Sequence, residues 1–273
     1  MVLPSDAESA STRRGAAPVW LSDLAGAWIF YSVLPAWPGI APRFERIARF
    51  APLVGLVLGG LQGGLWWLTQ GWLPLGARVA LVMALALGLT GGLHHDGALD
   101  TADGLAAGPR RRLQAMQDSR VGAAAVQAAL QLALLRVAAM LALASSPVGW
   151  VAMALAWAAV WGRMAPLLAM QAYPYLHRHG TAAFHRQHWR GLARELPPGL
   201  LALAWLVLMS LLVAQSMQLA LLGLLGVGPT LLVPWWLGGR LGGHSGDSYG
   251  ACVEWVETLA LLLMGLGLYS AAA

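Results

Sequence analysis

Apolar residues run continuously over most of the chain and are interrupted by short polar segments. A helix needs roughly 20 apolar residues to cross the hydrocarbon core of a bilayer. Seven stretches approach or reach that length, at residues 50–72, 77–93, 122–144, 148–170, 199–214, 219–237 and 255–269. Because the apolar runs are continuous rather than alternating, the pattern predicts transmembrane helices and not the strands of a barrel.

An eighth apolar stretch, at residues 20–34, is shorter, contains Asp23 and ends at a proline. It can span the membrane, re-enter it or lie in the interface. Residues 1–18 are polar and lack the apolar core of a signal peptide, which predicts a disordered tail. We therefore expect an all-α, polytopic transmembrane helical bundle of about seven spans, with a further N-terminal interfacial or re-entrant helix. Residues 19–273 would form a single integral-membrane domain.

The composition supports a membrane protein and limits the kinds of partner that the chain can be expected to bind. Of 273 residues, 58% are hydrophobic and 11% are charged, whereas soluble domains carry about 25% charged residues. The single cysteine, Cys252, excludes a disulfide framework and a cysteine metal cluster. The net charge of +5 indicates anionic lipid or phosphate partners. We expect no nucleic acid as a partner, because the sequence has no aromatic-and-basic motif of that kind.

The arginines are confined to alternate polar segments. They are Arg43, Arg46 and Arg49 before the first long stretch, Arg110, Arg111, Arg112 and Arg120 after the second, Arg178, Arg186, Arg190 and Arg194 after the fourth, and Arg240 before the last. The opposite segments hold only Arg78. By the positive-inside rule, the arginine-rich side is predicted to be cytoplasmic.

An acidic cluster follows the second long stretch. On a helix, steps of four and then three residues put Asp96, Asp100 and Asp103 on one face. These carboxylates repel one another unless a cation lies between them, and carboxylate oxygens suit Mg²⁺ or Mn²⁺ shared with phosphates. The cluster predicts a metal-dependent phosphoryl-transfer site at a membrane surface. The alternative is a solvated segment whose carboxylates cap helices.

Two further polar segments are candidates for the same site. Asp118 and Arg120 either end a helix or add a metal ligand and a phosphate-binding guanidinium, and the residues alone leave both readings open. Residues 242–250 are rich in glycine, which favours a ligand-binding loop over a plain connector. The candidates there are Gly242, Gly243, Ser245, Gly246 and Asp247, with Glu254 and Glu257 entering the last span.

Two arginines lie inside apolar stretches, where an unpaired guanidinium costs about 2.5–3.5 kcal/mol on insertion scales. Arg163 lies near the cytoplasmic end of its stretch and can face the site. Arg136 lies deeper, so we expect it to pair with an acid of another helix. The histidines at 177, 179, 185 and 188 indicate an interfacial segment rather than a zinc site, because no closed ligand set is evident.

These residues together resemble the cobalamin synthases (adenosylcobinamide-GDP ribazoletransferases). The long central motif reads Gly92-x-His94-x-Asp96-Gly97-x-x-Asp100-Thr101-x-Asp103-Gly104 and then Met116-x-Asp118-Ser119-Arg120-x-Gly122. The resemblance extends to Arg163-Met164-Ala165-Pro166 and to Gly242-Gly243-x-Ser245-Gly246-Asp247-x-x-Gly250, and it covers nearly all of the chain after residue 20. The departures, Ser32-Val33 in place of Thr-Arg, His95, Leu99 and Ser245, remove no carboxylate.

The resemblance implies the reaction that completes the nucleotide loop of cobalamin. A ribose hydroxyl of α-ribazole, or of its 5′-phosphate, would attack the phosphorus nearest the cobinamide of adenosylcobinamide-GDP. GMP would leave, and adenosylcobalamin or its 5′-phosphate would form. The corrinoid is then a substrate, no redox cofactor is needed, and the enzyme would lie in a bacterial inner membrane with its active site facing the cytoplasm. A homo-oligomer is left open.

The resemblance also implies roles for the candidate residues. Mg²⁺ would be held by Asp96, Asp100, Asp103 and Asp118, Arg120 would stabilise the phosphate, and His94 or a carboxylate would accept the hydroxyl proton. The substrates would contact Arg163, Gly242, Gly243, Ser245, Gly246, Asp247, Glu254 and Glu257.

Three other classes compete with this reading. A CDP-alcohol phosphatidyltransferase also uses clustered aspartates, but its usual Asp-Gly-x-x-Ala-Arg element is absent, since Asp96-Gly97 is followed by Ala98-Leu99-Asp100. A prenyltransferase of the ubiquinone type would need a second aspartate-rich motif. A transporter would need carboxylates in mid-span, whereas these lie at a helix end beside arginines.

Overall fold

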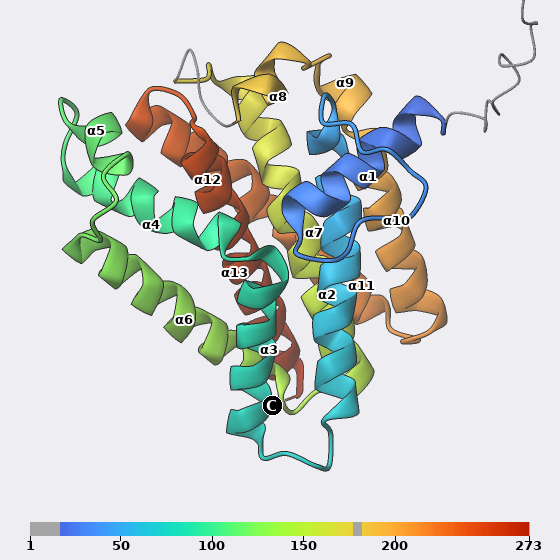
Figure 1. Cartoon of the computed structure of the whole chain (residues 1–273). Helices are drawn as coiled ribbons and strands as arrows, with labels where there is room; N and C mark the ends of the chain where they lie inside the picture. The colour runs from blue at the N-terminus through green and yellow to red at the C-terminus, as the bar shows by residue number, and fades with distance from the viewer. Residues whose placement is uncertain (1–16, 177–181, 273) are drawn as a thin grey trace, which may run out of the picture.

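The computed structural model describes residues 17–176 and 182–272, and the described chain is helical (Figure 1). The helices are α1 (Val19–Tyr31), η1 (Ile47–Phe50), α2 (Ala51–Leu68), α3 (Leu75–Thr90), α4 (Leu93–Ala106), α5 (Arg112–Met116), α6 (Ala123–Leu143), α7 (Val148–Ala172), α8 (Ala183–Gln187), α9 (Leu192–Glu195), α10 (Pro197–Leu212), α11 (Met217–Gly223), η2 (Leu224–Gly226), α12 (Val227–Leu241) and α13 (Gly246–Ala272). The all-α class is confirmed. The predicted tail falls outside the described residues except for positions 17 and 18, as do His177 and His179.

Each of the seven predicted stretches lies on helical structure, although residues 219–237 fall on α11, η2 and α12 together and residues 255–269 cover only part of α13. In the part of the chain that the structure describes, five helical runs are long and apolar enough to cross a membrane, namely Ile47–Leu68, Ala123–Leu143, Val148–Ala172, Met217–Leu241 and Gly246–Ser270. The other two, α3 and α10, have 16 residues each. A polytopic membrane protein is confirmed, with five or six spans by length rather than seven.

The N-terminal helix α1 is too short to cross the bilayer. Its 13 residues extend about 20 Å, against a hydrocarbon core of about 30 Å. It packs on η1 and α2 at the upper end of the bundle in Figure 1. Of the three arrangements expected for residues 20–34, spanning is therefore excluded.

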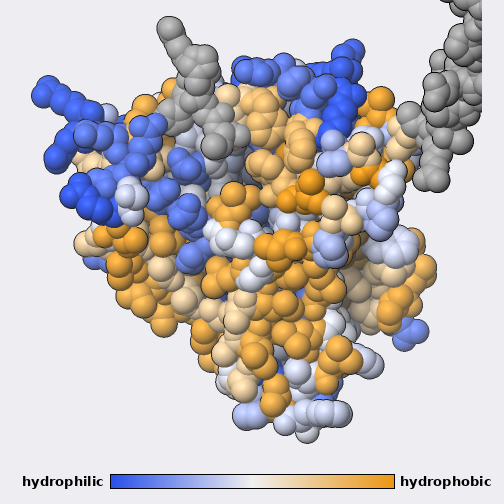
Figure 2. Space-filling view, viewed as in Figure 1, coloured by the Kyte–Doolittle hydropathy of each residue, from blue (hydrophilic) through white to orange (hydrophobic). Residues whose placement is uncertain are grey.

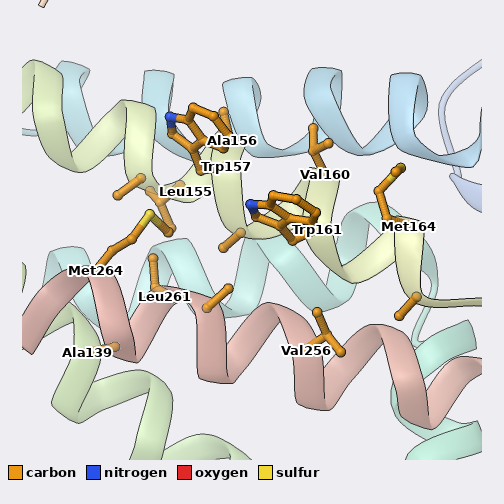
Figure 3. Packing of buried hydrophobic residues seen from close by; sticks show 14 of the residues in the cluster. Ala139, Leu155, Ala156, Trp157, Val160, Trp161, Met164, Val256, Leu261 and Met264 are labelled. Carbon is orange, nitrogen blue, oxygen red and sulfur yellow. The ribbon is translucent and has the colours of Figure 1, made fainter. Parts of the chain in front are cut away.

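Helix α7 is the centre of the bundle and packs between α2 and α13 (Figure 3). Its tryptophans bury their rings and still satisfy their polar atoms, because Trp157 Nε1 donates to Ser210 Oγ and Trp161 Nε1 donates to the Gly223 carbonyl. On α2, glycines spaced four apart face α7 directly. A Cβ on Gly59 would lie 2.6 Å from Ala156 Cα, and Gly55 and Gly63 meet the α7 backbone as closely. This small-residue contact is how helices approach each other in membranes.

Gly59→Ala is expected to destabilise the protein by about 1–3 kcal/mol, because the added methyl forces α2 away from α7. The neighbouring Gly60 supplies a matched control, since a Cβ there meets nothing within 4 Å. Thermal unfolding in detergent should show a lower Tm for Gly59→Ala and an unchanged or slightly higher one for Gly60→Ala. Equal Tm values for the two variants would contradict this packing.

Hydrophilic residues gather at one end of the molecule, over α4, α5, α8 and α9, and apolar residues cover the sides below them (Figure 2). The described arginines of the four basic segments lie in and beside these elements, including Arg112 on α5 and Arg186 on α8. The single arginine of the opposite segments, Arg78, donates to the Trp66 carbonyl and covers the Trp66 ring. The polar end is therefore one side of the membrane, and α4 lies on it.

Candidate functional site

A sharp corner places the acidic motif. Helices α3 and α4 meet at 91°, so α4 runs across the end of the bundle rather than continuing through the bilayer. The corner residues Gly91 and Gly92 have φ values of 60° and 74°, a left-handed conformation that favours glycine. The predicted span at residues 77–93 is therefore wrong at its end, because it includes the corner; α3 ends at Thr90.

Helix α4 lies directly on the start of α13. A Cβ on Gly97 would lie 2.6 Å from the Asp247 carbonyl oxygen, and one on Gly250 would lie 3.0 Å from the His94 carbonyl oxygen. The two glycines let the backbones approach closely, and this contact brings Asp247 beside the aspartates of α4. The sequence predicted Asp247 as a substrate contact but did not predict that it joins this cluster.

The clustered carboxylates act on one another. Partial burial, followed by the negative charges of Asp96, Asp247 and Asp103 in that order, raises the pKa of Asp100 to about 6. The predicted one-face arrangement on α4 is thus present in the helix. Among the described residues, however, no three acidic, histidine or cysteine side chains converge as a ready-made metal cage.

Asp103 holds the next helix. Its Oδ2 accepts a hydrogen bond from the Gly122 amide at 2.7 Å, and its Oδ1 accepts one from the Ala125 amide at 3.0 Å. These amides belong to the first turn of α6, which has no cap from its own N-cap side chain. The alternative considered from the sequence, a carboxylate that caps a helix, is therefore correct for Asp103 at least in part.

Asp118 and Arg120 form a separate, exposed pair between α5 and α6. The Arg120 guanidinium donates from Nη2 to Asp118 Oδ2 at 2.6 Å and from Nε to Oδ1 at 2.9 Å. These hydrogen bonds lower the pKa of Asp118 to about 2. Asp118 is not among the charges that act on Asp100, so the structure does not bring it into the cluster. The pair lines a cavity of about 240 Å³ that also contains Arg111.

The glycine-rich segment is mostly helix rather than loop. Helix α13 begins at Gly246, nine residues before the predicted start of the last span, so the prediction of a loop over residues 242–250 is wrong beyond Ser245. The physical reason is a reciprocal cap: the Ser248 amide donates to Ser245 Oγ, and the Ser245 amide donates to Ser248 Oγ. Gly242 and Gly243 take positive φ values of 81° and 152° and form the turn before it.

The buried charges below this end are paired with each other. Arg163 donates to Glu257 at 3.0 Å and to the Ala159 carbonyl, and Arg136 donates to Glu254 at 3.0 Å. The expected pairing of Arg136 with an acid of another helix is confirmed. Arg163, Glu254 and Glu257 were expected to contact substrate, and the structure shows them committed to ion pairs between α6, α7 and α13.

His94 lies under the acidic cluster and is 5% exposed. Its ring stacks on Tyr31 with centroids 6.1 Å apart, and its Nδ1 has no hydrogen-bond partner. Burial lowers the pKa of His94 to about 3, so the ring is a much weaker base than the Asp100 carboxylate. A cavity of about 670 Å³ opens beside it under the α3–α4 corner, lined by residues that include Ser32, Thr90, His95 and Asp96.

Comparison with known proteins yields one consistent group. The sequence model of a family described as cobalamin-5-phosphate synthase matches residues 23–265. A protein of Prochlorococcus marinus (strain MIT 9303), named adenosylcobinamide-GDP ribazoletransferase, is 56% identical over 259 residues, which cover 92% of this chain and 97% of that protein. Proteins with the same name from Thermosynechococcus vestitus and Synechocystis sp. are 43% and 42% identical, over 89% and 91% of this chain and 95% and 96% of their own lengths. No solved structure matches this chain.

Proposed function

The chain belongs to the cobalamin-5-phosphate synthase family, and we propose that it transfers the cobinamide phosphate of adenosylcobinamide-GDP to α-ribazole and releases GMP. It is a multi-pass membrane transferase of cobalamin biosynthesis. The observation that carries the proposal is that Asp96, Asp103 and Asp247 lie near enough to raise the pKa of Asp100 where α4 packs on α13, at the polar end of a bundle whose family carries this activity.

The two candidate acceptors, α-ribazole and α-ribazole 5′-phosphate, differ by one phosphate. The description of the family corresponds to the phosphorylated acceptor, and the name of the relatives corresponds to α-ribazole. With α-ribazole the product is adenosylcobalamin, and with α-ribazole 5′-phosphate it is the 5′-phosphate of cobalamin. Purified protein in liposomes, given adenosylcobinamide-GDP and each acceptor in turn, tests the proposal by mass spectrometry of the corrinoid. A corrinoid that gains no ribazole from either acceptor would contradict it.

The donor set at this end fits Mg²⁺ held jointly with a substrate. Asp100 lies among three like charges that raise its pKa, and a cation would remove that repulsion. The protein offers no closed cage among its described residues, and Mg²⁺ commonly takes one or two carboxylates together with phosphates and water. Asp96, Asp100 and Asp247 would be the ligands. When bound, the ion would neutralise charge on the diphosphate oxygens.

The remaining residues divide between proton transfer and binding. A carboxylate of the cluster, rather than His94, would accept the proton of the attacking hydroxyl, because burial lowers the pKa of His94 to about 3. Asp103 holds the start of α6 against α4. Asp118 orients the guanidinium of Arg120, whose side chain is 87% exposed and therefore free to take a phosphate.

Arg120→Lys is expected to lower kcat about ten- to a hundredfold while affinity for adenosylcobinamide-GDP changes less. Lysine keeps the charge but cannot make two parallel hydrogen bonds to a phosphate. The effect falls on kcat because the contact strengthens as charge builds on the departing GMP. Steady-state kinetics in liposomes measures it. A wild-type kcat in Arg120→Lys would leave Arg120 as a simple anchor at the membrane surface.

The polar end would face the cytoplasm, as the segregation of arginine suggests. Ser119 and Ser145 are exposed and flank the two ends of α6, and Cys252 is fully buried. In a Cys252→Ala background, an impermeant maleimide added outside intact spheroplasts should label Ser145→Cys and spare Ser119→Cys. The reverse labelling would overturn the orientation.

A transporter remains the main rival from another class. Its mid-span carboxylates would be Glu254 and Glu257, and both are engaged by arginines inside the bundle. The acids whose charges raise the pKa of Asp100 lie at the membrane surface instead. This distribution favours phosphoryl transfer over transport.

A further inference from the structure

A second, smaller cavity adjoins the acidic cluster and has no role in the proposed transfer as described so far. It has a volume of about 210 Å³ and shares Phe30, Leu93 and Asp96 with the larger cavity of about 670 Å³. Asp96 and Asp247 both line the smaller cavity. The cluster is therefore bordered by two separate spaces of different size, with Asp96 in their common wall.

The walls of the smaller cavity are aromatic and come from two preformed clusters. On one side, Phe30 of α1 meets the His185 ring edge-on with centroids 5.8 Å apart, and His185 stacks on Tyr31 at 6.4 Å. On the other side, Tyr249 of α13 stacks on His244 at 5.5 Å. Phe30, His185 and Tyr249 all line the space. Rings held in place by other rings lose little freedom when they stack on a planar ligand.

Two polar atoms at this cavity have no partner. His94 and His185 line it, are 5% and 6% exposed, and each has a buried Nδ1 without a hydrogen bond. Buried polar atoms in folded proteins are nearly always paired. Two such atoms beside one cavity point to a ligand that carries a hydrogen-bonding atom in a flat, otherwise apolar body.

We propose that the smaller cavity binds the planar base of the acceptor riboside. This inference rests on the proposed function and assigns a place to its second substrate. A benzimidazole riboside has a flat fused ring with one free ring nitrogen, which is an acceptor for an imidazole N–H. The ribose then extends toward Asp96 and Asp247, and the bulkier corrinoid donor takes the larger cavity. Two spaces that meet at Asp96 suit an in-line transfer, in which the attacking and leaving oxygens lie on opposite sides of phosphorus.

Calorimetric titration of α-ribazole into purified protein without donor tests the assignment. Phe30→Leu and Tyr249→Leu are each expected to weaken binding about tenfold, since each removes a stacking ring. Tyr249→Phe keeps the ring and should bind within about twofold of wild type. Trp20→Leu is the matched control, because Trp20 is an exposed aromatic residue on the same helix as Phe30 and does not line the cavity.

The ligand itself can be varied to test the unpaired imidazole atoms. An indole riboside has the same shape as the benzimidazole riboside but lacks the free ring nitrogen. Wild-type protein should bind it about tenfold more weakly, as expected for the loss of one hydrogen bond to a buried group. Equal affinities for the two ribosides would overturn the role of the histidines as partners of the base.

Titration of adenosylcobinamide-GDP separates the acceptor's base from the guanine of the donor. Unchanged donor affinity in Tyr249→Leu supports the proposal, because Tyr249 lines the smaller cavity and not the larger one, whereas Phe30 lines both. Weakened donor affinity with unchanged α-ribazole affinity would assign the cavity to guanine and overturn it, as would wild-type affinity for both. These failures are distinct from failure of the proposed function, because wild-type protein would still release GMP when given both substrates.

Discussion

Asp96→Asn and Asp100→Asn are each expected to lower kcat by at least about a thousandfold, while the variants fold as wild type does. Asparagine keeps the size of the side chain but removes the charge that would hold the cation against the diphosphate. Loss of a single preorganised group that stabilises transition-state charge typically costs two to three orders of magnitude in kcat, and loss of the ion costs more.

Two measurements make this prediction specific to the cluster. Titration of Mn²⁺ in the presence of adenosylcobinamide-GDP, followed by paramagnetic resonance, should show tight binding by wild type and none by Asp96→Asn. Asp103→Asn is the informative comparison, because it should lose about 1 kcal/mol of stability as a weakened cap of α6 in addition to any loss of activity. Near-normal turnover in well-folded Asp96→Asn and Asp100→Asn would contradict a catalytic role for these carboxylates.

Glu257→Gln is expected to have the largest effect on stability, about 3–5 kcal/mol, because it leaves Arg163 buried without its counter-charge. The Arg163 side chain is 3% exposed, and Arg136 also approaches Glu257 at 4.0 Å. Thermal unfolding in detergent should show a large drop in Tm. By contrast Glu45→Gln, which breaks an exposed pair with Arg43, should change stability by less than about 1 kcal/mol.

A double variant shows whether the Arg163–Glu257 ion pair itself stabilises the fold, or whether stability is lost only when one partner is left without the other. Replacing both partners, as Arg163→Met with Glu257→Met, removes the unpaired charge and should recover much of the stability lost in the single variant. A double variant as unstable as Glu257→Gln would contradict this explanation. Recovery of stability without recovery of activity would instead support the substrate contact first expected for Arg163 and Glu257.

The positions of the helices could be predicted from the sequence because hydrocarbon length alone determines what a transmembrane helix requires. The 91° corner at Gly91 could not, because a pair of glycines before a polar helix also fits a span that simply ends there. The start of α13 was missed for a related reason. Glycines at 242, 243, 246 and 250 indicate a loop when read locally, yet Gly250 is there because the backbone of α4 comes so close.

The acidic motif could be recognised from its spacing along one helix, which involves local geometry only, and the metal chemistry that this spacing suggests stays a prediction. The contribution of Asp247 and the capping by Asp103 depend on contacts between segments far apart in the chain, and no local pattern carries that information. One signal was available for the cap: the N-cap residue of α6 is Gly122, which has no side chain to cap the helix, and such an end needs a partner from elsewhere. The cavity lined by Phe30, His185 and Tyr249 is formed by three segments that lie far apart in the chain, so no pattern in the sequence could predict it.

The carboxylates at the α4–α13 contact are proposed to support the transfer of a phosphate from one substrate to the other. The most direct test reconstitutes the wild-type protein in liposomes with adenosylcobinamide-GDP, α-ribazole and Mg²⁺, and counts both products. We expect one GMP for each adenosylcobalamin formed, no GMP when α-ribazole is omitted, and no reaction when Mg²⁺ is chelated. GMP release without α-ribazole, or cobalamin formation that continues in the presence of chelator, would contradict the account.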